Sequence, residues 1–432
     1  MMITQPAVVT ALLLQLPASS SSLDNTPRII DLSQDFPQDT AAMTSSPGAA
    51  AIQQAASQDP LIRAAIVLEH GDIVASYHRD DVDPNETTFQ VFSTTKSWTS
   101  LLIGMLVEDG LLSLNETLGD VFPNNDAWAD VTDGSTDFRK NVTIEEMLTM
   151  SSGLISPPNS MSDMTWGGSS LEDSLSYPNV GVKGEFSYLG VSNIPSYIIK
   201  ERSGMNPRQY LAENVMDKLG IGEDEYNWQQ NLDGVEFGYH GLELTPIQMA
   251  KFGQLYLQGG QTNPSNNERL ISQEWIDASF TQHATEVTYG MPYGYLFWGH
   301  PFKSTAYCAL GLGAQDICID RELGRVVIQQ RDLNFEEISG GMQGLEHLIV
   351  SPFALNESLS FRVANDGLLL SSSPTVSPSK NNNGAGTAQP STARKDDGGK
   401  PTPQPDTSGG LNPMAVAASL WILSLSLVFA VY

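Results

Sequence analysis

Ser93 and Lys96 stand three residues apart in the stretch Phe92–Trp98, which reads FSTTKSW and precedes the apolar run TSLLIGMLVEDGLL. On a helix this spacing puts the hydroxyl and the amine one turn apart on the same face. A serine hydroxyl is a weak nucleophile that needs a base, and a lysine can be that base when burial lowers its pKa. The spacing therefore indicates a serine nucleophile with its own base, although a serine at this place can also simply cap a helix.

Strand patterns lie at the two ends of the region that carries this pair. A β-hairpin is expected at Arg63–Leu68 and Asp72–Tyr77, ahead of Ser93. Late in the chain, extended segments are expected at Tyr293–Trp298, Thr305–Leu310, Asp316–Ile319 and Arg325–Gln330. One antiparallel sheet can form if these two ends meet.

Helical patterns fill the middle of the chain. The helix after Ser93 is expected to stop at Gly110, and a capping box at Thr143 and Glu146 opens a helix that Gly153 should end. Further helices are expected at Ile194–Arg202, Pro207–Leu219, Pro246–Gln258, Ser272–Phe280 and Glu336–Ile349. The pattern predicts an α+β fold with a mostly helical second lobe.

Five sequence blocks, taken in order, resemble one family. They are FSTTKSWTSLLIGMLVEDGLLSLNETLGDVFP, VTIEEMLTMSSGL, LELTPIQMAKFGQLYLQGG, YGYLFWG and GLGAQDICID, within about residues 50–350. The chain resembles the β-lactamase-related serine hydrolases, and most of all the class C-like branch with esterases and 6-aminohexanoate-dimer hydrolases. The resemblance implies the β-lactamase/penicillin-binding-protein-like fold.

The resemblance also implies a catalytic set of a Ser-x-x-Lys pair, a tyrosine and a Lys-Thr-Gly-like strand. Ser93 and Lys96 match the pair. Tyr177 matches a Tyr-x-Asn pattern, but Tyr188, in GEFSYLGVSN, has the family's setting for its catalytic tyrosine, so we favour Tyr188. For the strand, Gly311-Leu312-Gly313 stands in place of Lys-Thr-Gly.

That glycine motif should let a backbone N–H approach an oxyanion, and we expect it on an edge strand. It lacks the lysine that would hold the carboxylate of a β-lactam, which argues against antibiotic hydrolysis as the main role. The sequence has no GxSxG motif, which argues against an α/β-hydrolase.

Composition excludes several other classes of function. The formal net charge is −28, which disfavours binding to nucleic acids or anionic lipids. Neither the scattered histidines nor the two cysteines match a metal-binding motif, so we expect no metal, and the implied chemistry needs no cofactor. Cys308 and Cys318 fit either a disulfide across a hairpin or two buried thiols.

The N-terminal residues predict passage through the secretory pathway. Residues 1–22 have the short apolar core of a signal peptide, without its usual basic start, and residues 23–60 form a polar lead-in. Four N-glycosylation sequons, at Asn85, Asn115, Asn141 and Asn356, support the same route.

The C-terminal residues predict a membrane attachment. After a hydrolase domain at 61–365, residues 366–413 read as a disordered polar linker, and Met414–Tyr432 are uncharged and mostly apolar. Small residues, a polar spacer and a hydrophobic tail are typical of a GPI-anchor signal, although the same tail could also span a bilayer.

Together these features predict a serine hydrolase at the extracellular face of a cell membrane, acting on a small ester or amide. Ser93 would attack the carbonyl, Lys96 and Tyr188 would share the proton transfers, and the backbone around Leu312 would bind the oxyanion. The alternative is a catalytically inactive β-lactamase-like domain that binds a ligand at the cell surface.

Overall fold

The computed structural model describes residues 28–45, 47–129, 137–154, 170–176, 181–188, 193–265, 267–285, 290–300 and 303–333, with 363–364 and 367–368. The chain divides into two compact units, and Glu357–Trp421 is the smaller. Within that smaller unit the described residues are one antiparallel pair, β12 (Val363–Ala364) and β13 (Gly367–Leu368). All the residues of the candidate site belong to the larger unit.

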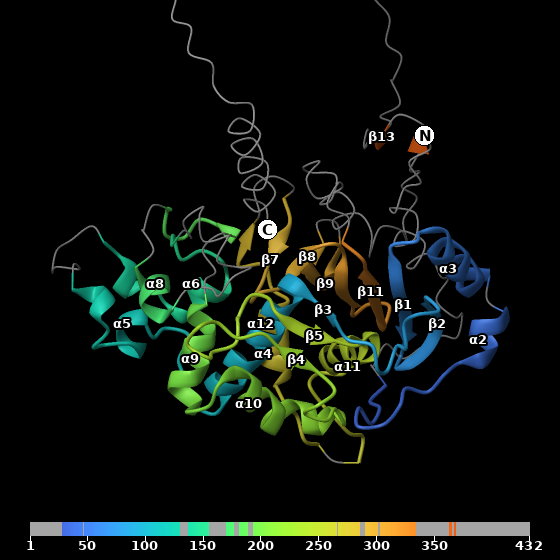
Figure 1. The fold of residues 1–432 in the computed structure, drawn as a ribbon, viewed down its shortest axis with the longest axis horizontal. Helices are drawn as coiled ribbons and strands as arrows, with labels where there is room; N and C mark the ends of the chain where they lie inside the picture. Colours follow the sequence, from blue (N-terminus) through green and yellow to red (C-terminus); the bar gives the residue numbers. More distant parts are fainter. Residues whose placement is uncertain are drawn as a thin grey trace, which may run out of the picture. The chain divides into compact units, whose positions relative to one another are not determined.

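The larger unit contains an eight-stranded antiparallel sheet in the order β2-β1-β11-β10-β9-β8-β7-β6. Its strands are β1 (Ile62–Glu69), β2 (Asp72–His78), β6 (Ala284–Thr285), β7 (Pro292–Tyr293), β8 (Trp298–His300), β9 (Lys303–Gly311), β10 (Gln315–Asp320) and β11 (Arg325–Arg331). Strand β1 pairs with β11, with Ile66 opposite Ile328. The early hairpin and the late strands therefore join into one sheet, as predicted, and Figure 1 shows β1 and β11 side by side.

The expected single strand Tyr293–Trp298 is wrong, because β7 and β8 are separated by a tight turn. Leu296 in this turn has a left-handed backbone, with φ of 59°. Gly294 permits the turn, since a Cβ there would lie 1.9 Å from the carbonyl oxygen of Ser279. The turn brings Tyr293 and Trp298 opposite each other as a cross-strand pair.

The helices of the larger unit lie on both sides of the β1–β11 strand pair (Figure 1). They are α2 (Thr40–Ser45), α3 (Pro47–Gln58), α4 (Thr95–Glu108), α5 (Leu118–Val121), α6 (Ile144–Leu148), α8 (Leu171–Leu175), α9 (Ile194–Ser203), α10 (Pro207–Leu211), α11 (Pro246–Leu257) and α12 (Gln273–Ser279). Single turns of 3-10 helix are η1 (Phe92–Thr94), η2 (Asp126–Trp128), η3 (Arg139–Asn141) and η6 (Asp217–Leu219), and η5 (Ala212–Met216) is a π-helical turn.

Two helix groups cover the sheet. Helix α11 packs across β1, β10 and β11, and α2 and α3 pack on the β1–β2 hairpin. Gly253 lets α11 approach closely, because a Cβ there would lie 2.5 Å from Val326 and 3.0 Å from Ile317. Residues ahead of α2 also join the larger unit, since Ile30 exchanges hydrogen bonds with the Gln258 side chain.

Local signals placed most helix ends correctly. Helix α4 ends just before Gly110, whose φ is 70°, and Thr143 and Glu146 form the predicted capping box. The prediction that Gly153 ends that helix is wrong, because α6 ends at Leu148. The left-handed backbone of Met150, with φ of 56°, cannot continue a right-handed helix.

A second, three-stranded sheet connects two segments that contribute to the candidate site, the Ser93 turn and residues 237–241. It has the order β3-β5-β4, with β3 at Phe89–Gln90, β5 at Leu242–Leu244 and β4 at Asn227–Trp228. Strand β3 comes directly before the Ser93 turn, and β5 comes directly after residues 237–241. This sheet therefore fixes those two segments relative to each other.

Cys308 and Cys318 form a disulfide between β9 and β10, where the two residues are directly opposite. Of the two alternatives for these cysteines, the structure has the disulfide. It joins the two strands whose connection carries Gly311, Leu312 and Gly313.

Several predictions concern residues that lie outside those the structure describes. They are the signal peptide at 1–22, Tyr177, the helix at Glu336–Ile349, the sequon at Asn356, the tail Met414–Tyr432 and all but residues 367–368 of the linker. In the described part of the chain no helix combines the length and the apolar character that crossing a membrane requires.

Candidate active site

Ser93 lies in the single turn η1, at a sharp junction between strand β3 and helix α4. The backbone N–H of Val91 donates to Leu242 on β5, which fixes the start of the turn. Phe92 has a left-handed backbone with φ of 48°, a conformation that is unfavourable for a bulky residue and that proteins often retain at functional sites. The junction thus presents Ser93 ahead of α4 rather than inside it.

Buried hydroxyl groups that follow Ser93 fasten the start of α4 to three other segments. Thr94 Oγ1 donates to the Gln315 carbonyl at 2.5 Å, which ties the turn to β10. Ser97 Oγ donates to the Leu296 carbonyl at 2.7 Å, and Thr99 Oγ1 donates to the Gly238 carbonyl at 2.8 Å. The run STTKSWTS therefore positions Ser93 through side chains that are themselves buried.

The Lys96 ammonium lies beside the Ser93 hydroxyl. Nζ donates to Ser93 Oγ at 2.8 Å and to the Tyr239 carbonyl at 3.2 Å. The side chain is 5% exposed, and burial lowers the pKa of Lys96 from 10.5 to about 7, since a buried site disfavours the charged form. Near neutral pH a large fraction of Lys96 is therefore a neutral amine that can accept the proton of Ser93.

Tyr188 completes the group around Ser93. Its hydroxyl hydrogen-bonds with the side chains of Ser93 and Trp298, and Lys96 Nζ lies 4.7 Å from the centre of its ring. Burial raises the pKa of Tyr188 to about 12, so its phenol keeps its proton at neutral pH. The structure thus brings together Ser93, Lys96 and Tyr188, whereas the rival Tyr177 lies outside the described residues.

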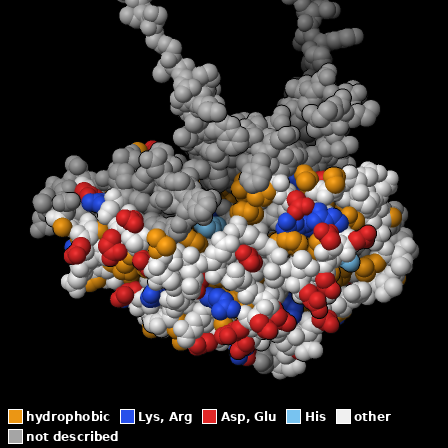
Figure 2. Space-filling view, viewed as in Figure 1, with side chains coloured by type: hydrophobic (Ala, Val, Ile, Leu, Met, Phe, Trp, Pro, Cys, Tyr) orange, Lys and Arg blue, Asp and Glu red, His pale blue; other side chains and the backbone are white. Residues whose placement is uncertain are grey.

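Aromatic rings form one side of the site. This aromatic wall consists of Phe186, Tyr188, Tyr293 and Trp298. The Trp298 ring centre lies 5.2 Å from that of Tyr188 and 4.8 Å from that of Tyr293. Figure 2 shows hydrophobic side chains gathered on this face in the region of β8. A substrate at Ser93 would therefore meet an apolar surface on this side.

The Gly311-Leu312-Gly313 motif lies close to the Ser93 turn. Gly311 is the last residue of β9, and a Cβ there would lie 2.3 Å from the carbonyl oxygen of Val91. Only glycine permits so close an approach of two backbones. The expectation of an edge strand is wrong, because β9 lies between β8 and β10. The paired part of β8 nevertheless reaches only Cys308, so the end of β9 extends beyond it.

Comparison with known families agrees with this arrangement. The model of the family described as Beta-lactamase matches residues 42–336, which is more than half of the chain. The chain belongs to the Beta-lactamase family. Esterases, amidases and β-lactamases that use a serine occur in this family, and the chain has its antiparallel sheet flanked by helices.

Solved structures of two proteins share the Beta-lactamase fold with the chain. A Bacillus anthracis protein assigned as a 6-aminohexanoate-dimer hydrolase is 16% identical, with a TM-score of 0.55 over 76% of this chain and 91% of that one. EstCE1, a hydrolase with promiscuous acyltransferase activity, is 14% identical, with a TM-score of 0.53 over 70% of this chain and 96% of that one. At such identities the similarity concerns the fold alone. No curated protein sequence matches the chain.

Within this Beta-lactamase fold, the site includes three residues that the sequence does not predict. The Tyr239 carbonyl binds Lys96, the Trp298 side chain binds Tyr188, and His240 is a buried neighbour of Lys96. The block YGYLFWG contains Trp298, so the resemblance marked its region but gave the tryptophan no role. No local sequence pattern predicts a role for Tyr239, because it contributes a backbone carbonyl rather than its side chain.

The described residues contain no group of three or more His, Cys, Asp or Glu side chains arranged to hold a metal ion.

Proposed function

We propose that this chain hydrolyses an ester or an amide through an acyl-enzyme on Ser93. The observation that carries the proposal is the 2.8 Å hydrogen bond between Ser93 Oγ and Lys96 Nζ, made by a lysine whose pKa burial lowers to about 7. A nucleophile and a base within hydrogen-bonding distance, the base with its pKa near the working pH, are what covalent catalysis by serine requires.

In the first half of the reaction, neutral Lys96 accepts the proton of Ser93 as Oγ bonds to the substrate carbonyl carbon. The tetrahedral intermediate carries its negative charge on the former carbonyl oxygen. The backbone N–H groups of Ser93 and Leu312 would bind that oxygen, and the close approach of the two backbones at Gly311 supports this assignment.

Collapse of the intermediate then requires a proton for the leaving group. Tyr188 is the donor, because its raised pKa keeps its phenol protonated at neutral pH. The Lys96 ammonium then gives its proton to the Tyr188 phenolate, which restores the neutral amine and the protonated phenol. In the second half, water attacks the acyl-enzyme carbon, the acid is released, and Ser93 regains its proton.

The Ser93→Ala variant tests this proposal. We expect p-nitrophenyl acetate turnover to fall on the order of a million-fold, the typical cost of removing the nucleophile from a cooperating set. A fluorophosphonate probe should label the peptide that contains Ser93 in the wild type and nothing in the variant. Ser113→Ala, which changes an exposed serine, is the matched control and should keep both turnover and labelling.

The same experiment tests the alternative function, a catalytically inactive domain that binds a ligand. Suppose that the purified wild-type chain shows the cooperative thermal melting of a folded protein but neither turns over esters nor takes up the probe. That result would exclude the hydrolase and leave the inactive binding domain.

We further propose that the hydrolase is held at the outer membrane face. The observations that support this are sequence features, namely the apolar run within residues 1–22, the sequons, and the apolar residues Met414–Tyr432 behind a polar stretch. A GPI anchor fits the order of small residues, spacer and tail.

A further inference from the structure

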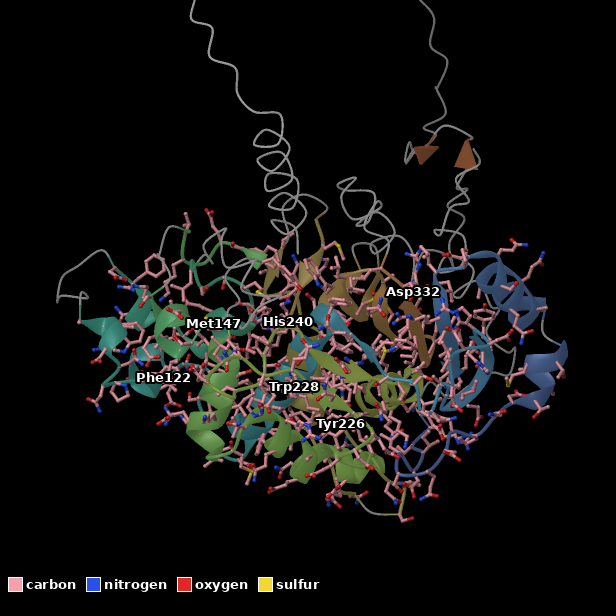
Figure 3. All side chains as sticks on the ribbon, in the orientation of Figure 1. Phe122, Met147, Tyr226, Trp228, His240 and Asp332 are labelled. Carbon is pink, nitrogen blue, oxygen red and sulfur yellow. A yellow bond between two sulfur atoms is a disulfide. The ribbon has the colours of Figure 1, made fainter. Side chains whose placement is uncertain are left out.

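His240 lies at the candidate site but takes no part in the proton transfers described above. The preceding residue, Tyr239, accepts a hydrogen bond from Lys96 through its carbonyl, and the positive charge of Lys96 contributes to lowering the pKa of His240. Figure 3 labels His240 in the middle of the view, and Figure 2, in the same orientation, shows histidine surface at that place. His240 is therefore a titratable group near Lys96 to which the proposed reaction gives no role.

Packing rather than hydrogen bonding holds the imidazole in place. Its ring stacks on Phe237 with centres 4.4 Å apart, and the Tyr239 ring meets it edge-on at 4.5 Å. The residue is 5% exposed, and its Nε2 has no hydrogen-bond partner. Buried polar atoms in proteins nearly always have a partner, so a fixed ring nitrogen without one beside an active site is a candidate for binding a ligand.

The imidazole is neutral at any physiological pH. Burial, together with the nearby Lys96 ammonium, lowers the pKa of His240 to about 3. A neutral imidazole has one N–H donor and one acceptor nitrogen. An amide or a hydroxyl group also has both, so it can pair with either tautomer of the ring. A carboxylate can only accept, and it gains no charge attraction from this ring.

The Gly311-Leu312-Gly313 motif points to the same preference. Where the resemblance expects a lysine that holds a carboxylate, this chain has glycine. With His240 neutral and that lysine absent, these two positions offer no fixed cation to an anionic substrate.

We propose that His240 contacts the substrate and selects one that carries a neutral hydrogen-bonding group, such as an amide, near the scissile carbonyl. This inference rests on the proposed hydrolase function and adds the chemical class of its substrate. His240 is then a specificity-determining residue, distinct from the Ser93, Lys96 and Tyr188 set.

Two methyl esters of equal skeleton test the proposal. N-acetylglycine methyl ester carries an amide where methyl 4-methylpentanoate carries a branched hydrocarbon, and acid release from both can be followed at constant pH. The wild type should prefer the amide ester, and His240→Phe, which keeps a ring on Phe237, should reduce the ratio of the two kcat/KM values by about tenfold or more. His240→Gln keeps a donor and an acceptor and should retain part of the preference.

His283→Phe is the matched control. His283 also stacks on an aromatic ring, that of Tyr295 at 4.4 Å, but it is exposed and its Nε2 contacts the Ala278 carbonyl at 2.9 Å. Its replacement should leave the ratio as in the wild type. A wild type with no preference, or a His240→Phe ratio equal to that of the wild type, would overturn the proposal.

A binding measurement separates this inference from the hydrolase itself, because it needs no turnover. Calorimetry with N-acetylglycine methyl ester on Ser93→Ala should give a Kd at least about fivefold lower than on Ser93→Ala with His240→Phe. Equal Kd values would contradict a role for His240 even if the chain is a hydrolase. If His240→Phe does not fold, His240→Leu, which also lacks the ring nitrogens, takes its place in both measurements.

Discussion

At the scale of single residues, the proposed chemistry depends on two proton-carrying groups whose pKa values burial moves in opposite directions. Burial disfavours charge, so it lowers the pKa of Lys96 to about 7 and raises that of Tyr188 to about 12. The first can therefore accept a proton at neutral pH while the second still has one to give. Environments that separate two such groups in this way are typical of acid–base pairs in enzymes.

The Tyr188→Phe variant tests the donor. The change removes only the hydroxyl and keeps the ring in the aromatic wall, so we expect kcat to fall by roughly a hundred- to ten-thousand-fold with nearly unchanged thermal melting. Tyr177→Phe is the control and should retain activity. A large fall in Tyr177→Phe alone would transfer the role to that residue.

The pH profile tests the acceptor. Only the neutral amine of Lys96 can take the proton of Ser93, so kcat/KM should rise with pH, with a midpoint near 7, and level off above it. Tyr188 should not limit the rate until far above this range, because its pKa is about 12. Stopped assays with p-nitrophenyl acetate over pH 5.5–9 measure the profile. A kcat/KM that still rises up to pH 9 without levelling off would contradict the lowered pKa of Lys96.

At the scale of elements, the site depends on close contact between the Ser93 turn and the end of β9. Thr94 bonds to β10, and Gly311 faces the Val91 carbonyl. The Cys308–Cys318 disulfide joins β9 to β10 just before this point. The geometry of the proposed oxyanion site would therefore be set by this close approach of two backbones, which a side chain at Gly311 would prevent.

The Gly311→Ala variant tests this approach. Its Cβ would lie 2.3 Å from a backbone oxygen, so one of the two segments must move. We expect kcat/KM to fall by about a hundredfold or more, the usual cost of losing an oxyanion donor, with a smaller effect on KM. Gly222→Ala, where a Cβ would meet only the Asp224 and Glu225 side chains, is the matched control. Full activity of Gly311→Ala would exclude an oxyanion role for this strand end.

At the scale of the whole molecule, the sheet requires both ends of the folded region. Strands β1 and β11 are direct neighbours although more than two hundred residues separate them, and Ser93 lies between them in the sequence. The apolar residues Met414–Tyr432, which predict membrane attachment, lie beyond this region of the sequence. Attachment and catalysis should therefore be separable.

Release from cells tests the attachment. Phosphatidylinositol-specific phospholipase C should release the activity from intact cells, and deletion of Met414–Tyr432 should send an active enzyme into the medium with unchanged kcat. Heat-treated phospholipase serves as the control. Recovery of cell-bound protein that still contains peptides from Met414–Tyr432 would identify a membrane span instead.

The sequence by itself determined the features that depend on near neighbours along the chain. The Ser93–Lys96 spacing, the capping box at Thr143 and the strand patterns all act within a few residues, so they could be predicted. The family resemblance also predicted Tyr188 and the region of Gly311. It could do so because matching blocks in the same order indicate a shared fold, which brings distant segments together.

Only the tertiary structure decided how these residues are surrounded. The carbonyl that binds Lys96 comes from Tyr239, 143 residues away, and the Leu296 carbonyl that binds Ser97 is 199 residues away. The turn at Leu296 replaced a predicted strand, and β9 became an interior strand, because contacts with distant segments override local propensity. The pKa values of Lys96, Tyr188 and His240 follow from burial, and burial exists only once the chain has folded.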